Sequence, residues 1–184
     1  MSHHHHPSSD AVATSVTATT GFPAVVITVS DRSSRGERSD ASGPIAVDAL
    51  TSAGFACEPP TIVPDGADAV ESALRAALER GARLIVTTGG TGIAARDLTP
   101  EGTSPVLSRV LPGIAEELRR IGTAEKPGGM LSRGLAGVVD PSHDRPGALI
   151  VNLPGSTGAV ASGISVVVSV AAHVISQLGG GDHE

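Results

Sequence analysis

The chain has 184 residues, a formal net charge of −6 and a single cysteine, and 40% of its residues are hydrophobic, with two Phe and neither Trp nor Tyr. This length predicts one domain with an aliphatic core, because compact domains usually run to roughly 100–200 residues. Nonspecific nucleic-acid binding is excluded as a function, since it needs clustered cations and, for single strands, aromatic stacking platforms.

The termini and the cysteine bear on domain limits and location. Residues 1–21 are rich in Ser, Thr and Ala and include a histidine run typical of a purification tag, so we expect a disordered tail there. We expect residues 22–180 to form the domain and residues 181–184 a frayed tail. No segment reaches the roughly 20 uninterrupted apolar residues of a membrane span, and the N-terminus lacks a signal peptide's apolar core. Cys57 has no intrachain partner, which predicts a buried structural thiol in a cytoplasmic protein.

Strand and helix patterns alternate after Pro23. In chain order they predict a strand at 24–30, a helix at 45–53, a strand at 61–63, a helix at 67–80 and a strand at 83–88. This alternation indicates βαβ units with right-handed crossovers, and therefore parallel strands between helical layers.

The C-terminal half departs from that rhythm. Residues 108–121 are predicted to form a helix broken near Pro112-Gly113, residues 135–139 and 148–152 to form an antiparallel hairpin, and residues 157–178 to form a closing helix. We therefore expect an α/β fold with three layers, α/β/α, and a mostly parallel mixed sheet that ends in a C-terminal antiparallel hairpin.

Four polar loops follow predicted strands. In an open α/β sheet, ligands bind beyond the carboxyl ends of the strands, where such loops converge. The loops are Ser30-Asp31-Arg32, Pro64-Asp65-Gly66, Thr87 to Gly92, and Asn152 to Ser156.

The loop Thr88-Gly89-Gly90-Thr91-Gly92 is the most informative, because its glycines let the backbone approach a ligand and direct N–H groups at a phosphate. A turn that merely joins a strand to a helix is the open alternative. The loop is neither a P-loop nor a G-x-G-x-x-G motif. Lys126, the only lysine, lies far downstream. Phosphate handling without a lysine therefore points to arginines, backbone N–H groups, helix ends or a metal.

A polar run directly follows the glycines. Thr99 and Pro100 make a reasonable helix start, which Glu101 would complement electrostatically. Asp97 precedes that start, and if Asp65 reaches the same cleft the two carboxylates would repel by roughly 4 kcal/mol at about 4 Å with an effective dielectric of about 20. Mg²⁺ would relieve this repulsion. The open alternative makes Asp65 a turn residue and pairs Asp97 with its neighbour Arg96.

Other polar residues carry weaker signals. The segment around Arg38, Asp40, Ser42 and Gly43 is either a ligand-facing loop or a solvated connector. Ser132-Arg133 could bind an anion or cap a turn. We expect a solvated helix face for Glu116, Glu117, Arg119 and Arg120, and structural roles for His143 and His173.

Taken together, the loops resemble the Mog/MoaB-type molybdopterin-binding family, which also includes the G domains of gephyrin and of plant molybdenum-insertion proteins. The similarity spans about residues 24–178. Its motifs are VVITVSDR, SGP at 42–44, TTGGTGIAARDLTPE, LPGIAEELR at 111–119, MLSRGLAGV at 130–138 and LIVNLPGS. TTGGTG followed by RDLTPE is the most specific of them.

The resemblance implies a cytoplasmic homotrimer that adenylylates molybdopterin with Mg-ATP, releases pyrophosphate and precedes a molybdenum-insertion protein. Asp65 and Asp97 would be catalytic and would hold Mg²⁺. The substrate would be bound by Thr88, Gly89, Gly90, Thr91, Gly92, Ser132, Asn152, Pro154, Gly155 and Ser156, and the nucleotide by Ser30, Asp31 and Gly43. A noncatalytic binding or scaffold module of the same fold is the alternative, and an enzyme resembling the related domain of competence-damage proteins is a weaker one.

Overall fold

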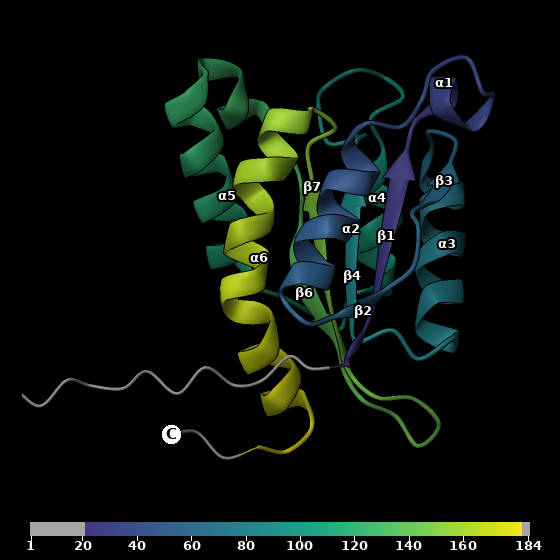
Figure 1. The fold of residues 1–184 in the computed structure, drawn as a ribbon, viewed down its shortest axis with the longest axis vertical. Coiled ribbons are helices and arrows are strands. Elements are labelled where there is room, and N and C mark those ends of the chain that lie inside the picture. Colours follow the sequence, from purple (N-terminus) through teal and green to yellow (C-terminus); the bar gives the residue numbers. More distant parts are fainter. Residues whose placement is uncertain (1–20, 182–184) are drawn as a thin grey trace, which may run out of the picture.

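The structure is a computed structural model that describes residues 21–181. The predicted α/β fold is confirmed: helices flank a central mixed sheet that is mostly parallel and has an antiparallel part (Figure 1). The predicted tails at 1–21 and 181–184 lie outside the described residues except for Gly21 and Gly181.

The sheet has seven strands, and five of them run in parallel. Its order is β2-β1-β4-β7-β6-β5, and β3 pairs with β1 beyond the end of β2. β6 is antiparallel to β7 and to β5, which confirms the predicted hairpin. The strands are β1 (Pro23–Val29), β2 (Ala56–Cys57), β3 (Thr61–Val63), β4 (Leu84–Thr88), β5 (Arg109–Val110), β6 (Ala136–Val139) and β7 (Ala148–Leu153).

Helices cover both faces of the sheet. The α-helices are α1 (Asp31–Ser34), α2 (Ser42–Ser52), α3 (Ala67–Glu79), α4 (Thr99–Thr103), α5 (Pro112–Glu125) and α6 (Thr157–Leu178), and two 3₁₀ segments are η1 (Ser104–Val106) and η2 (Pro127–Leu131). Figure 1 shows α2, α5 and α6 on one face and α3 on the other. The prediction of the closing helix at 157–178 is confirmed.

The core forms two aliphatic layers because successive strand residues point to opposite faces. Val86 and Val151 pack under α2 and α6, whereas Ile85 and Ile150 pack under α3. All five residues of β4 are buried, as expected for a strand covered on both sides. Burying each such side chain stabilises the fold by roughly 1.5–3 kcal/mol.

The predicted helix at 108–121 is wrong in its first turn. Arg109 and Val110 form β5 against β6, and α5 begins at Pro112. Proline lacks a backbone N–H and has a fixed φ, so it suits the first helical turn rather than the interior. Pro112 therefore starts this helix instead of breaking it.

Helix α6 is long and apolar enough to cross a membrane by length and composition, with a mean hydropathy of 1.9 over its most apolar window. Core helices of soluble proteins pass the same test. Here Val160, Ile164, Val167 and Ile175 are buried in the domain core, where α6 contacts α2, α5 and β7. This packing is the pattern of a core helix.

Candidate functional site

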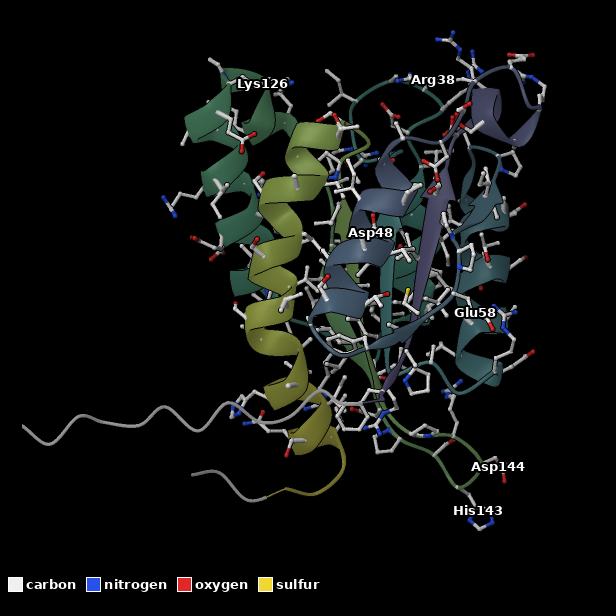
Figure 2. All side chains as sticks on the ribbon, in the orientation of Figure 1. Arg38, Asp48, Glu58, Lys126, His143 and Asp144 are labelled. Atoms are coloured by element: carbon white, nitrogen blue, oxygen red, sulfur yellow. The ribbon has the colours of Figure 1, made fainter. Side chains whose placement is uncertain are left out.

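Two pockets adjoin at the carboxyl edge of the parallel strands. The larger has a volume of about 390 Å³ and the smaller about 290 Å³. Gly89, Gly155 and Ser156 line both, so the loops after β4 and β7 form a shared wall. Figure 2 shows Arg38 and Lys126, one from each pocket lining, at the same end of the molecule, opposite His143 and Asp144.

The larger pocket brings together almost all the residues predicted to bind substrate. The glycine loop forms one side, and α5 with η2 and the start of α6 form the others. The predicted residues in its lining are Gly89, Gly90, Thr91, Gly92, Ser132, Asn152, Pro154, Gly155 and Ser156. Thr88 is the exception, because it is fully buried and lies in the smaller lining, where its hydroxyl is 3.1 Å from that of Ser42.

The glycine loop has a conformation that requires glycine at its start. Gly89 and Gly90 have φ of +94° and +66°, in the left-handed region. A Cβ on Gly89 would also lie 2.4 Å from the carbonyl oxygen of Val29. Among residues 21–181, no group accepts a hydrogen bond from the backbone N–H of Gly90, Thr91 or Gly92. These donors are available to a ligand in the larger pocket.

Asp40 organises the smaller pocket. Its Oδ2 accepts from the Thr28 hydroxyl at 2.6 Å, and its Oδ1 accepts the N–H groups of Ser42 and Gly43 at 3.1 and 3.0 Å. The side chain thus binds the first N–H groups of α2, and Arg38, Asp40 and Ser42 of this segment line the smaller pocket. Ser30 also lines this pocket.

Gly43, predicted to contact the nucleotide, lies behind Asp40 and outside both pocket linings. A Cβ there would be 2.2 Å from the Asp40 carboxylate. Because glycine has no Cβ, the Asp40 carboxylate can pack against the start of α2. Gly43 therefore contributes to the smaller pocket indirectly, by leaving room for Asp40.

Asp31 and Asp65 bind each other's backbones. The Asp31 N–H donates to Asp65 Oδ2 at 3.2 Å, and the Asp65 N–H donates to Asp31 Oδ1 at 3.0 Å. Arg96 Nη1 donates to Asp31 Oδ2 at 2.6 Å, and this bond, followed by the one from Asp65, lowers the pKa of Asp31. The open alternative that paired Arg96 with Asp97 is therefore wrong, because Arg96 pairs with Asp31.

Asp97 lines the larger pocket, and its Oδ2 accepts the N–H of Ala94 at 3.0 Å. Asp65 lines neither pocket. The two acids belong to loops that Arg96 links through Asp31. Asp65 thus follows β3 and is bonded to Asp31 after β1, whereas Asp97 shares the lining of the larger pocket with the glycine loop.

Lys126 and Arg119 line the larger pocket, which contradicts two expectations. The sole lysine was expected far from a phosphate site, and Arg119 was expected on a solvated face. Arg119 instead donates to the carbonyls of Ser132 and Gly134, both at 3.3 Å. The expected solvated face is present one residue later, where Arg120 pairs with Glu117.

Thr99 is not a helix cap. It is fully buried inside α4, and its hydroxyl donates to the carbonyl of Gly89 at 2.9 Å. Leu98 precedes the helix without any side-chain cap bond. Glu101 pairs with Arg133, whose hydrogen bond is the first cause of the lowered pKa of Glu101. The predicted helix start is confirmed, with Pro100 and Glu101 in its first turn, but Thr99 makes a tertiary contact in place of the predicted cap.

Asn152 lines the larger pocket but uses its side chain within the protein. Its Oδ1 accepts the N–H of Leu135, and its Nδ2 donates to the hydroxyls of Thr87 and Thr103, each at 3.0 Å. Both amide N–H donors and one of the two acceptor positions of Oδ1 are thereby occupied by protein groups. Asn152 holds β4, β6 and α4 in place beneath the pocket.

The remaining predicted candidates lie outside both linings. Cys57 is half-buried rather than fully buried, and desolvation raises the pKa of its thiol. His143 is exposed in the turn between β6 and β7, and His173 is exposed on α6, where it contacts Gln177. These three residues do not belong to the site.

Within residues 21–181, no group of three or more His, Cys, Asp or Glu side chains could hold a metal ion by itself. Mg²⁺ is usually held by one or two carboxylates together with substrate phosphates and water. Asp97 lines the larger pocket and Asp65 lines neither, so the structure does not bring the two predicted magnesium ligands into one pocket lining.

An α/β fold whose glycine loop lines one of two adjoining pockets with unpaired N–H groups is typical of proteins that bind phosphate-bearing ligands. The family model described as "Probable molybdopterin binding domain" matches residues 25–173. The chain belongs to this Mog/MoaB molybdopterin-binding family.

Relatives with this similarity are named for cofactor assembly. The "Molybdopterin adenylyltransferase" of Pyrococcus furiosus is 38% identical over 82% of this chain and 87% of its own. The "Molybdenum cofactor biosynthesis protein B" of Staphylococcus carnosus is 39% identical over 73% and 77%. The solved Mog protein of Mycobacterium ulcerans is 40% identical, with a TM-score of 0.77 over 88% of this chain and 99% of that one. The chain spans about half the length of its bifunctional curated relatives, at 50% and 49%.

Proposed function

We propose that the protein binds molybdopterin and transfers AMP from Mg-ATP to the terminal phosphate of that substrate, releasing pyrophosphate. The observation that carries this proposal is the shared wall of Gly89, Gly155 and Ser156 between the two pockets. Group transfer between two substrates needs their reacting atoms held side by side, which can lower the barrier by roughly 7–11 kcal/mol. Two pockets that meet at one wall offer that arrangement.

We propose one ligand for each pocket. The larger pocket would take molybdopterin, whose terminal phosphate would face the N–H groups of Gly90, Thr91 and Gly92. The smaller would take the nucleotide. Helix α6 has 22 residues and begins at the shared wall, with Ser156 as its N-cap, so its partial positive end favours phosphate there.

The proposed reaction needs positioning more than a protein nucleophile. An oxygen of the molybdopterin phosphate attacks the α-phosphorus of ATP, the bond to the β-phosphate breaks, and pyrophosphate leaves. Lys126 and Arg119, which line the larger pocket, would offset the charge of the pterin phosphate. When bound, Mg²⁺ would neutralise the charge of the nucleotide phosphates. Asp65 and Asp97 are the side chains proposed to hold it, and Ser30 and Asp31 would border the nucleotide.

The absence of Trp and Tyr limits how the pterin can be recognised. The apolar side chains in the larger pocket are aliphatic or proline, namely Ala115, Leu118, Leu131, Pro154 and Ala159. Backbone groups and Ser132 offer hydrogen bonds. We therefore propose recognition by hydrogen bonding and shape rather than by aromatic stacking.

The proposal extends to assembly and location. We propose a cytoplasmic homotrimer that passes its product to a molybdenum-insertion protein. Light scattering of the purified chain tests the oligomeric state directly. A mass equal to one protomer would contradict the trimer without affecting the proposed reaction.

Single substitutions of Asp65 and Asp97, compared with a control substitution of another aspartate, test the activity. The unmutated protein, given molybdopterin and Mg-ATP, should form adenylylated molybdopterin. Asp65→Asn and Asp97→Asn should abolish turnover while leaving the circular dichroism spectrum and the free energy of unfolding nearly unchanged. Asp48→Asn, on the exposed face of α2 (Figure 2), is the matched control and should leave turnover intact. Molybdopterin binding without any product would favour the noncatalytic binding module instead.

A further inference from the structure

All four carbonyl oxygens of the glycine loop are held by two residues. The Thr99 hydroxyl donates to Gly89 O at 2.9 Å and the Thr99 N–H donates to Gly90 O at 3.0 Å. The Arg133 N–H donates to Thr91 O at 2.8 Å and its Nε donates to Gly92 O at 2.8 Å. Thr99 and Arg133 therefore fix every peptide carbonyl from residue 89 to residue 92.

This pattern decides where the N–H groups point. A peptide unit is planar and trans, so its C=O and the following N–H point in opposite directions. Holding the carbonyls of Gly89, Gly90 and Thr91 on one side turns the N–H groups of Gly90, Thr91 and Gly92 to the other. Those three N–H groups have no acceptor among residues 21–181.

Thr99 and Arg133 lie on the side of the loop away from the ligand. Neither lines either pocket, whereas residues 89–92 all line the larger one. The contact is close, because a Cβ on Gly90 would lie 2.3 Å from the Thr99 hydroxyl oxygen. Their donors therefore support the loop from behind.

Arg133 is itself held in place. Its guanidinium pairs with Glu101, and its Nη2 donates to the carbonyl of Asp97. A guanidinium offers five donors in a rigid planar fork, so one side chain can bind the carbonyls of Gly92 and Asp97 and the carboxylate of Glu101 together. A lysine ammonium has no such fork. Arg133 thus couples the glycine loop to the segment that carries Asp97.

We propose that Thr99 and Arg133 are positioning residues that turn the glycine loop into a phosphate-binding nest by holding its four carbonyl oxygens away from the larger pocket. A carbonyl oxygen facing a phosphate would repel it, whereas converging N–H groups attract it. The inference rests on the proposed function only in taking the ligand of this pocket to carry a phosphate group. It does not require that adenylyl transfer takes place.

The test uses inorganic phosphate as the probe and the backbone amide NMR signals of the loop as the readout. In the unmutated protein, phosphate should shift the amide signals of Gly90, Thr91 and Gly92. Thr99→Val, a neutral change of nearly equal volume, should weaken phosphate binding roughly fivefold, the factor that one net hydrogen bond is worth. Thr99→Ser keeps the hydroxyl and should restore the affinity.

Arg133→Lys separates geometry from charge, and it remains informative if Thr99→Val fails to fold. It keeps the positive charge but loses the bond from Nε to Gly92 O, so phosphate binding should again weaken severalfold. Gly102→Ala is the matched control: its Cβ would press the same helix, α4, against the Ala67 carbonyl oxygen, while Gly102 neither lines a pocket nor contacts the loop. It should leave the phosphate affinity unchanged.

Two results would overturn the inference. One is the absence of phosphate-induced shifts at residues 90–92 in the unmutated protein. The other is an equal loss of affinity in Gly102→Ala and Thr99→Val, which would assign Thr99 a general structural role. Failure of the proposed function looks different, because a protein that forms no adenylylated product would still show these shifts and their loss in the variants.

Discussion

Asn152→Ala should destabilise the fold by about 3 kcal/mol. The 2% exposed side chain makes three hydrogen bonds, to Leu135 N–H and to the hydroxyls of Thr87 and Thr103. Each intramolecular hydrogen bond contributes about 1 kcal/mol net, and a buried donor left without an acceptor costs about 1–3 kcal/mol. For a chain of this size the melting temperature should fall by roughly 6–12 °C.

Urea denaturation followed by circular dichroism measures this loss. The double variant Asn152→Ala/Thr103→Val should show a coupling energy of about 1 kcal/mol, because the bond between the two residues is lost only once. Thr123→Val, which removes a hydroxyl bond within α5, is the control and should cost less than about 1 kcal/mol. A loss below about 1 kcal/mol for Asn152→Ala would refute the role assigned to Asn152.

Two further predictions concern packing and pH. Gly102→Ala should destabilise by about 1–3 kcal/mol in urea denaturation, because its Cβ would lie 2.4 Å from the Ala67 carbonyl oxygen. Gly113→Ala on α5 meets nothing within 4 Å and should instead stabilise by roughly 0.5–1 kcal/mol, so equal effects would contradict the packing argument. The pKa of Glu101 should lie below its ordinary value because of Arg133 and return towards it in Arg133→Met, as followed by carboxyl NMR. Because this pKa is lowered, the ion pair stabilises the fold above the ordinary glutamate pKa and is lost as pH falls through the lowered value.

The fold was predictable where the pattern was local and long enough. Strands β1, β4 and β7 are apolar runs covered on both faces, and α6 has helical spacing over 22 residues. Strands β2 and β5 have two residues each, which is too short for any periodicity. They exist because β1 and β6 supply hydrogen-bonding partners for them. Only the tertiary structure could reveal them.

The candidate site was predictable as a set of loops and less so as a set of side chains. The sheet topology alone brings the loops after β4 and β7 together, since these strands are parallel neighbours. Lys126 reaches the larger pocket because η2 folds back on α5, where a Cβ on Gly129 would lie 2.2 Å from the Gly122 carbonyl carbon. Gly122 and Gly129 allow this contact because they have no side chains, and this pair of glycines was the signal in the sequence that could have predicted it. Thr99 was misassigned because a local cap pattern competes with a tertiary bond to Gly89.

The most direct test of the central claim is a single-turnover reaction between bound molybdopterin and ATP that is labelled at its α-phosphate. The measurement is the identity of the compound that carries the label afterwards. The account predicts that the label appears in adenylylated molybdopterin, with one pyrophosphate released for each product formed. Release of ADP, transfer of the γ-phosphate, or label that remains entirely in ATP while molybdopterin is bound would contradict the claim that the two adjoining pockets carry out adenylyl transfer.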